Sequence, residues 1–299
     1  MENNNSTVKV VSWNVNAFCK TERWNAFKNE ERKKWQLDCY TDVLEGIKCL
    51  LEIVEKEGIV FLQEIPLQKS DIWGKLEKEL EGYNVESGFN GKEPYICTVM
   101  ISKKKENDWN KSEKQVKNTK VKDKGNTYET YYNNRCIVSN RHSLDSSVLS
   151  VHIPDVRYSP AALILWNDII EYARTEEPDI IIGDFNTDAE DTPQWRSMKE
   201  LMNIDIGQVN YYPKKHPKYP TYVEATGSAK RTRVGIPKTF HWDNDGEEQG
   251  THVDYALVRE DIANKVERYE IIKMWKENTK IINFKELSDH YPLLLEIKL

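Results

Sequence analysis

Five short motifs in this chain each place an Asn, Asp, Glu or His at or beside the end of an apolar run. Carboxylate, amide and imidazole groups gathered at one edge of a sheet could bind a hard cation and activate a water molecule. The motifs therefore predict a metal-and-imidazole site built from strand ends. In chain order they are residues 12–16 (Ser-Trp-Asn-Val-Asn), 62–64 (Leu-Gln-Glu), 151–154 (Val-His-Ile-Pro), 183–186 (Gly-Asp-Phe-Asn) and 288–290 (Ser-Asp-His).

Oxygen atoms dominate the ligand set that these motifs offer. Glu64 ends a strand directly before a turn, Asn14 offers an amide oxygen, and Asp184, Asn186 and Asp289 add further oxygens. A set with few carboxylates suits Mg²⁺ or Mn²⁺, which keep some of their waters and bind a substrate phosphate. Zinc would require cysteines or closely spaced histidines, and none is arranged in that way.

Two histidines, His152 and His290, stand at strand ends, and Asp254 could orient one of them. An Asp–His pair can take a proton from water, while a second imidazole stabilises the far side of a phosphate. Asp184 and Asn186 occupy alternate positions, so both project to one side if the local chain is extended. The predicted reaction is metal-assisted attack of water on a phosphodiester.

Each motif also has a simpler interpretation when it is taken alone. Residues 183–186 could form a turn, residues 288–290 could cap one, and His152 could be a hydrogen-bonded core histidine. All five motifs occur in order and each lies at a strand end, and this joint occurrence favours the functional interpretation.

The elements that must position these residues follow from apolar patterning. Residues 1–7 are polar and rich in asparagine, so we expect a disordered tail there. No composition break divides the rest of the chain, so we expect a single domain over 8–299. Because strands and helices mix without strict alternation, we expect two packed mixed sheets with outer helices, an α/β (α+β) fold. Strands are expected at residues 8–15, 59–65, 95–102, 136–140, 148–153, 179–183, 253–258, 269–275 and 292–297, and helices at 31–56, 70–81, 160–174 and 194–202.

Composition limits the classes of protein that remain. The 299 residues are 38% hydrophobic and 31% charged, which suits a globular protein, and no apolar run is long enough for a transmembrane helix. Five irregularly spaced cysteines make no disulfide framework, and no secretory signal is visible, so a cytoplasmic location is expected, with a mature form made from a longer precursor as the open alternative. The net charge of −6 argues against nonspecific coating of nucleic acid.

With residues 252–255 (His-Val-Asp-Tyr), the five motifs make six that resemble those of the endonuclease/exonuclease/phosphatase superfamily, over residues 10–299. The resemblance implies a four-layer α/β sandwich and divalent-metal phosphoester hydrolysis. Glu64 resembles the principal metal ligand, with Asn14 and Asp289 assisting. Asp184 and Asn186 resemble the pair that positions the nucleophile or a second ion and the phosphate. His290, paired with Asp254, resembles the catalytic histidine.

Further matches suggest a branch of the superfamily. His152 resembles the second histidine of the deoxyribonuclease I, sphingomyelinase and inositol-phosphatase branches, which abasic endonucleases lack. Glu93 resembles the glutamate that orients that histidine, and Arg135 resembles an arginine that contacts the substrate phosphate. The inositol phosphatase pattern is incomplete, since Thr187 follows Asn186 where that branch has a longer motif. The disulfides of deoxyribonuclease I are absent too.

Two basic stretches, residues 103–135 and 211–238, indicate the substrate. Both are expected to be long loops that rim the site in this fold, and aromatic residues such as Tyr219 and Trp242 lie in or near the second. Cationic loops with aromatic side chains suit a polyanion with stackable bases. We therefore expect a nuclease, with DNA favoured over RNA, no membrane partner and no indicated oligomeric state. The alternatives are a phosphomonoesterase or lipid or inositol headgroup phosphoesterase, and an inactive binding module.

Overall fold

The computed structural model describes most of the chain. The described residues are 7–20, 29–66, 70–88, 96–104, 109–117, 121–123, 126–128, 134–154, 162–187, 197, 222–224, 240–244, 247–251, 253–277 and 279–298. The expected tail lies outside them except for Thr7, which begins the first strand. Glu93, the helix expected at 194–202 apart from Ser197, and most of the second basic stretch also lie outside the described residues.

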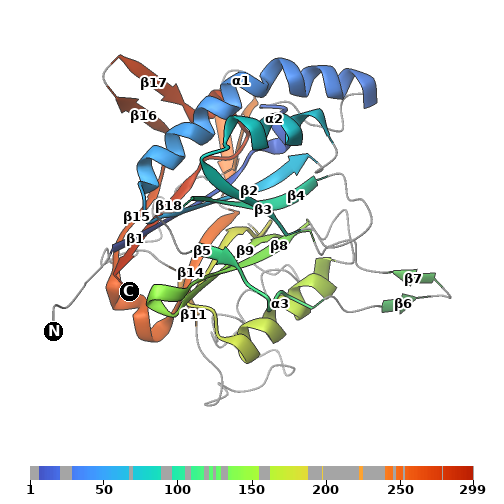
Figure 1. Ribbon diagram of the computed structural model, residues 1–299. Coiled ribbons are helices and arrows are strands. Elements are labelled where there is room, and N and C mark those ends of the chain that lie inside the picture. The colour runs from blue at the N-terminus through green and yellow to red at the C-terminus, as the bar shows by residue number, and fades with distance from the viewer. Residues whose placement is uncertain are drawn as a thin grey trace.

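Two six-stranded mixed sheets form the centre of the molecule (Figure 1). The first has the order β15-β18-β1-β2-β4-β3 and the second β11-β14-β10-β9-β8-β5. The strands of the first sheet are β15 (Val266–Ile271), β18 (Leu293–Lys298), β1 (Thr7–Asn14), β2 (Ile59–Pro66), β4 (Ile96–Lys103) and β3 (Tyr83–Ser87). Those of the second are β11 (Tyr222–Glu224), β14 (Asp254–Arg259), β10 (Ile180–Asp184), β9 (Ser146–His152), β8 (Cys136–Arg141) and β5 (Trp109–Lys111).

Helices cover the outer face of each sheet, which gives four layers (Figure 1). The helices α1 (Asn29–Val54) and α2 (Asp71–Glu79) pack on the first sheet, and α3 (Ala162–Glu176) packs on the second. Ser70 caps α2 by accepting a hydrogen bond from the backbone of Trp73, which satisfies an otherwise orphan donor. The expected four-layer α/β sandwich is confirmed.

Each sheet has one apolar core against its helices, and a third apolar core, the inter-sheet core, lies between the two sheets. Alternate residues of each strand face it, as the two-residue period of a strand requires. Val8 and Val10 of β1 face it, as do Ile180 and Ile182 of β10. The intervening residues of the same strands, such as Val11 and Ile181, pack against the helices instead.

Strand directions bring the motif-bearing ends together. β1 runs parallel to β2, and β9 runs parallel to β10, so all four strands end with their motif residues. β14 and β18 run antiparallel to their neighbours, so their motif residues lie at their starts. The carboxyl ends of β1, β2, β9 and β10 and the amino ends of β14 and β18 therefore meet at one end of the sandwich.

The structure corrects the strand expected at residues 269–275, which is parts of two strands. The first, β15, ends at Ile271, and Ile272 N then donates to Pro292 O at 2.8 Å. The chain then enters a hairpin of β16 (Met274–Glu277) and β17 (Lys280–Asn283), whose Trp275 packs towards the α1 core.

The basic stretches are not wholly loops. They and the region after them contain the hairpins β6 (Val121–Asp123) with β7 (Asn126–Tyr128) and β12 (Phe240–Asn244) with β13 (Glu247–Thr251), as well as β5 and β11. These strands are short and polar, so they lack the apolar alternation that identifies a buried strand.

All five cysteines are buried and free. None of the helices in the described chain combines the length and apolar character needed to cross a bilayer.

Candidate active site

The site residues of the second sheet stand side by side in one row. Asp184 is the last residue of β10, and its registered neighbours are His152, which ends β9, and Asp254, which begins β14. All three are at most 3% exposed. Residues in register share a face of the sheet, and Asp184 continues the line of Ile180 and Ile182, so the row faces the first sheet across the inter-sheet layer.

Gly183 makes the approach of β9 and β10 possible. Its φ of +144° lies outside the range of ordinary side chains, and a Cβ atom there would stand 1.9 Å from Val151 O. Two residues on, Asn186 has a left-handed φ of 47°. Its backbone N donates to Asp184 Oδ1 at 2.9 Å and its Nδ2 to Asp184 Oδ2 at 2.9 Å. The Gly-Asp-Phe-Asn motif therefore fixes the Asp184 carboxylate.

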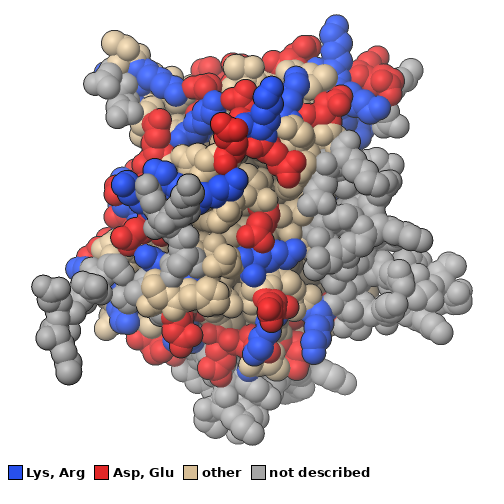
Figure 2. Space-filling model, in the orientation of Figure 1, with Lys and Arg blue, Asp and Glu red and all other residues tan. Residues whose placement is uncertain are grey.

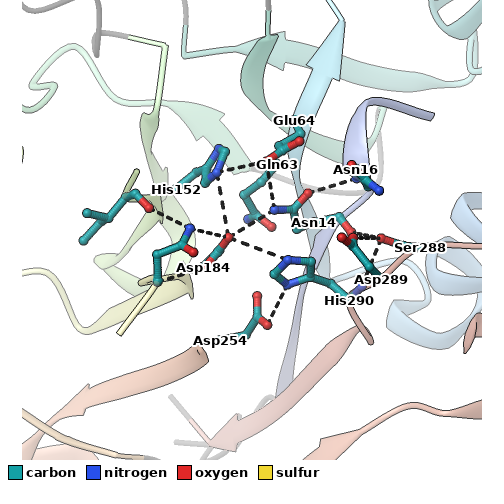
Figure 3. Close-up of polar contacts among 12 residues, drawn as sticks. Asn14, Asn16, Gln63, Glu64, His152, Asp184, Asp254, Ser288, Asp289 and His290 are labelled. Atoms are coloured by element: carbon teal, nitrogen blue, oxygen red, sulfur yellow. Dashed lines mark hydrogen bonds and ion pairs between the residues drawn. The ribbon is translucent and has the colours of Figure 1, made fainter. Parts of the chain in front are cut away.

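A β-bulge in β2 directs Glu64 towards that row. Between Leu62 and Ile65 the strand carries one residue more than its partner β4, and Glu64 adopts a left-handed φ of 58°. Leu62 and Ile65 both pack against the helices, so Gln63 and Glu64 both fall on the inter-sheet side. Glu64 Oε1 then lies 3.2 Å from His152 Nε2 on the opposite sheet (Figure 3).

Glu64 is ionised in this setting. Burial alone would raise its pKa, but its hydrogen bond with His152 and the nearby positive groups lower the pKa to about 2. His152 is itself neutral near pH 7, because burial and the Arg135 charge lower its pKa to about 4. The hydrogen bond of His152, rather than its charge, therefore stabilises the carboxylate.

Arg135 lies against the ring of His152. Its Nη1 is 2.8 Å from Nδ1 and 2.9 Å from Nε2. A guanidinium can only donate, so the ring nitrogen that it contacts must be an acceptor, in agreement with a neutral imidazole. We assign Nδ1 as that acceptor, which leaves a proton on Nε2 for Glu64. The structure thus brings the expected phosphate-binding arginine to the expected second histidine.

Asn14 connects the two sheets inside the site. Its Nδ2 donates to Asp184 Oδ2 at 3.1 Å and to Glu64 Oε1 at 3.4 Å, while its Oδ1 accepts from Asn16 N at 2.9 Å. The amide nitrogen, and not the oxygen, therefore faces the carboxylates. The role of Asn14 as a metal ligand stays a prediction.

His290 and Asp254 form the expected pair. The distance from His290 Nδ1 to Asp254 Oδ2 is 2.9 Å, and His290 Nε2 lies 4.0 Å from Asp184 Oδ2. Burial opposes the imidazolium charge, but Asp254 and the other acids outweigh it and raise the pKa of His290 to about 10. The pair therefore has a high affinity for a proton on the side that faces Asp184.

The turn that carries Asp289 and His290 is held to the first sheet by hydrogen bonds. Ser288 Oγ donates to Asn14 O at 2.7 Å, and Trp13 Nε1 donates to His290 O at 2.9 Å. Both contacts join residues more than 270 positions apart in the sequence. Ser288 and Trp13 had no predicted role, although both belong to motifs that the sequence analysis identified.

Two carboxyl groups have raised proton affinity because they are buried. Desolvation and the nearby Asp254 raise the pKa of Asp184, although His290 and the Asn186 backbone oppose the shift. Desolvation and the charge of Glu64 raise the pKa of Asp289 to about 7. Several acids packed in one place favour a cation among them.

The residues present fit a divalent cation. Glu64 Oε2 is buried and has no hydrogen-bond partner within the described part of the chain, which is costly for an ionised carboxylate. Asp184, Asp254 and His290 offer ligand atoms within 4.8 Å of one another, but His290 Nδ1 is already engaged with Asp254. Asp184 and the unpartnered Glu64 oxygen would suit a hard cation such as Mg²⁺ or Mn²⁺, and Asp289 stays the third expected ligand.

Of the first basic stretch, Arg135 lies in this site, but Lys103, Lys104 and Lys114 do not. Lys103 follows Ser102, the strand partner of Ile59 at the start of β2, so it lies at the opposite end of the sandwich from the site. There Lys103 pairs with Tyr83 of β3, and the neighbouring Lys104 Nζ donates to Glu81 O. Lys114 pairs with Glu176 at the end of α3. On the face in Figure 2, basic and acidic side chains are interspersed rather than separated by sign. For these lysines, the expectation of a basic rim is wrong.

The model of the endonuclease/exonuclease/phosphatase family matches residues 11–290, so the chain belongs to that family. Comparison with curated protein sequences gives no match.

Solved structures show the same fold at low identity. D. rerio TDP2, complexed with single-strand DNA product, is 14% identical with a TM-score of 0.58, and the match covers 98% of this chain and 100% of that one. The 3'-5' exonuclease NExo from Neisseria meningitidis is 15% identical with a TM-score of 0.57, covering 97% and 100%. An AP endonuclease from Archaeoglobus fulgidus is 15% identical with a TM-score of 0.57, covering 98% and 100%.

Proposed function

We propose that this protein hydrolyses phosphodiester bonds in nucleic acid with the help of a divalent metal, and that DNA is favoured over RNA. One observation carries the proposal. The Asp254–His290 pair, 2.9 Å apart, faces Asp184 at 4.0 Å beside an ionised Glu64 that has a buried oxygen without a partner in the described chain. This combines a proton acceptor, a carboxylate that can orient water and a cation ligand at one sheet edge.

The residues divide the chemistry between them. His290 accepts the proton of the attacking water at Nε2, and Asp254 holds the ring through Nδ1. Asp184, fixed by Asn186, orients that water. Arg135, which the neutral His152 holds by accepting a hydrogen bond, contacts the phosphate oxygens on the other side, where a guanidinium can bind two of them at once.

Glu64, Asp289 and Asp184 would hold Mg²⁺ or Mn²⁺ at the site. Such an ion would neutralise the phosphate charge and lower the proton affinity of His290 towards the working pH.

The comparisons support nucleic acid as the substrate class. The D. rerio TDP2 structure contains a DNA product, and another Neisseria NExo structure, described as a 3' phosphatase, contains a product DNA hairpin. The five free cysteines agree with the reducing cytoplasm that we expect as its location.

A substrate panel tests the proposal. Purified protein is incubated with labelled single- and double-stranded DNA, RNA, a phosphoinositide and a small phosphomonoester, each with Mg²⁺ or with excess chelator. We expect cleavage of DNA that the chelator abolishes and that Mn²⁺ restores. Cleavage of the phosphoinositide or the monoester, with both nucleic acids intact, would overturn the proposed substrate class.

Matched variants separate an enzyme from an inactive binding module. Glu64→Ala and His290→Ala should each lose DNA cleavage, whereas Glu45→Ala removes an equivalent carboxylate on the outer helix α1 and should cleave normally. If all of these proteins behave alike, the cleavage comes from a contaminant and the catalytic assignment fails.

A further inference from the structure

The site is divided between two sheets that apolar packing holds together. Glu64 and Asn14 belong to the first sheet, and His152, Asp184 and Asp254 belong to the second. Contacts of 3.1–3.2 Å cross between them. Apolar burial is non-directional, so it resists separation of the sheets but sets no registry between them. A site of this kind needs a directional link close by.

Gln63 makes such a link directly beneath the site. Its side chain is fully buried, and its Nε2 donates to Ser12 Oγ at 2.9 Å and to Ser150 Oγ at 3.1 Å. Ser12 belongs to the same sheet as Gln63, whereas Ser150 belongs to the opposite one. The bond to Ser150 therefore joins β2 to β9 across the inter-sheet layer.

The three residues lie one step below the reacting groups. Ser12 precedes Asn14 by two positions, Ser150 precedes His152 by two, and Gln63 directly precedes Glu64. Two positions along a strand return to the same face, so this polar layer lies between the inter-sheet core and the site. Any slip of β2 against β9 would therefore change the 3.2 Å distance between Glu64 and His152.

Stability alone does not account for an amide in this place. Gln63 Oε1 is buried and lacks a hydrogen-bond partner within the described residues, and a buried polar atom without a partner is destabilising. A methionine of similar length, together with alanines in place of Ser12 and Ser150, would fill the same layer without unpaired polar atoms. The amide is thus retained at the expense of stability, in a layer whose neighbouring positions are apolar.

We infer that Gln63 is a positioning residue whose bond to Ser150 sets the registry of Glu64 against His152 and Asp184. This inference rests on the proposed hydrolytic function of the same site. Gln63 itself touches no reacting atom. Its effect passes through the strand end that it holds, where a displacement of about 1 Å can cost on the order of 10²-fold in rate.

The test compares Gln63→Met and Ser150→Ala, which break the cross-sheet bond, with two controls. Ser12→Ala removes only the acceptor on the same sheet. Ser139→Ala deletes a fully buried hydroxyl on β8 that has no hydrogen-bond partner in the described chain. We expect kcat for DNA to fall about tenfold or more in the first two variants, with KM nearly unchanged, and both controls to stay within about twofold.

The double variant Gln63→Met/Ser150→Ala distinguishes positioning from general damage. Both changes remove the same cross-sheet bond, so the double variant should be no slower than the slower single variant. Urea unfolding should show that the double variant, in which no Ser150 hydroxyl is left unpaired, is at least as stable as Gln63→Met. Additive losses, or a loss of kcat that tracks a loss of stability, would overturn the inference.

A second readout does not depend on cleavage. The imidazole ¹⁵N resonances of His152 should shift in Gln63→Met and Ser150→Ala but stay in place in Ser139→Ala. Unchanged resonances in all variants overturn the positioning role even if the wild type cleaves DNA. An inactive wild type whose His152 resonances shift as expected would instead remove the proposed function and leave the inter-sheet link established.

Discussion

The two ends of the inter-sheet layer differ although the same strands run through both. At the end where β1 and β2 begin, Trp109 is fully buried in the inter-sheet core, and its Nε1 donates to Glu57 O at 3.0 Å. Arg141 Nη2 meets Glu57 Oε2 at 3.1 Å at the margin of that end. At the other end the same layer passes through Ser12, Gln63 and Ser150 into the charged groups of the site.

The difference shows where stability and chemistry are located. The end where β1 and β2 begin, called the closed end, contains the large apolar side chain of Trp109. The single polar atom of that side chain is satisfied, which stabilises the fold. The end that carries the site, called the open end, contains the buried carboxyl groups of Asp184 and Asp289, whose pKa values are raised, and the Glu64 oxygen that has no partner in the described chain. These features cost stability and suit catalysis. Substitutions at the two ends should therefore have opposite consequences for stability and activity.

The largest effect is expected for Asp254→Asn at the open end. The change keeps the shape of the side chain but removes the charge that orients His290, so kcat for DNA should fall by about 10²–10⁴-fold while urea unfolding is little changed. The double variant with His290→Ala should be no slower than His290→Ala alone, because the two residues act as one unit. A double variant slower than both would show that they act independently.

At the closed end, Trp109→Ala should destabilise the protein by about 3–5 kcal/mol, because it removes a buried aromatic side chain and leaves a cavity. The kcat per folded molecule, measured well below the unfolding midpoint, should stay within about twofold of wild type. Urea denaturation and initial cleavage rates provide the two measurements. A selective loss of kcat at full folding would mean that the closed end also controls the site.

The smallest effect on stability comes from one substitution made at both ends. Glu57→Gln should change the free energy of unfolding by less than about 1 kcal/mol and leave activity intact, because the Glu57 side chain is 55% exposed and its backbone carbonyl still binds Trp109. Glu64→Gln should leave the fold intact and lower kcat sharply. Equal kcat values in these two variants would remove the functional distinction between the ends.

The sequence predicted the ends of the strands that carry the site well, because each strand signals its own end. The apolar run 180–182 stops at Gly183 and Asp184, and β10 ends there as well. His152 and Asp254 likewise mark strand boundaries within one residue of the expected ones. Parallel and antiparallel pairing then brings these ends together, which the resemblance to the family implied and strand patterning alone did not.

The remaining features depend on geometry that patterning does not record. The bulge at Glu64 adds a single residue and changes no apolar period that can be recognised in 62–65. The amide of Asn14 offers both a donor and an acceptor, and only the position of Asn16 N decides which atom faces the carboxylates. Gln63 had no predicted role because an amide in an apolar strand gains meaning only from its partner on the other sheet.

The left-handed backbone of Glu64 has a consequence for how this protein responds to selection. A non-glycine residue at φ 58° is strained by roughly 1–3 kcal/mol, and here it also carries a buried charge. Glycine would relax the backbone and remove the charge together. A directed-evolution screen that rewards heat resistance without assaying cleavage should therefore enrich Glu64→Gly. The resulting proteins would be more thermostable and would not cleave DNA.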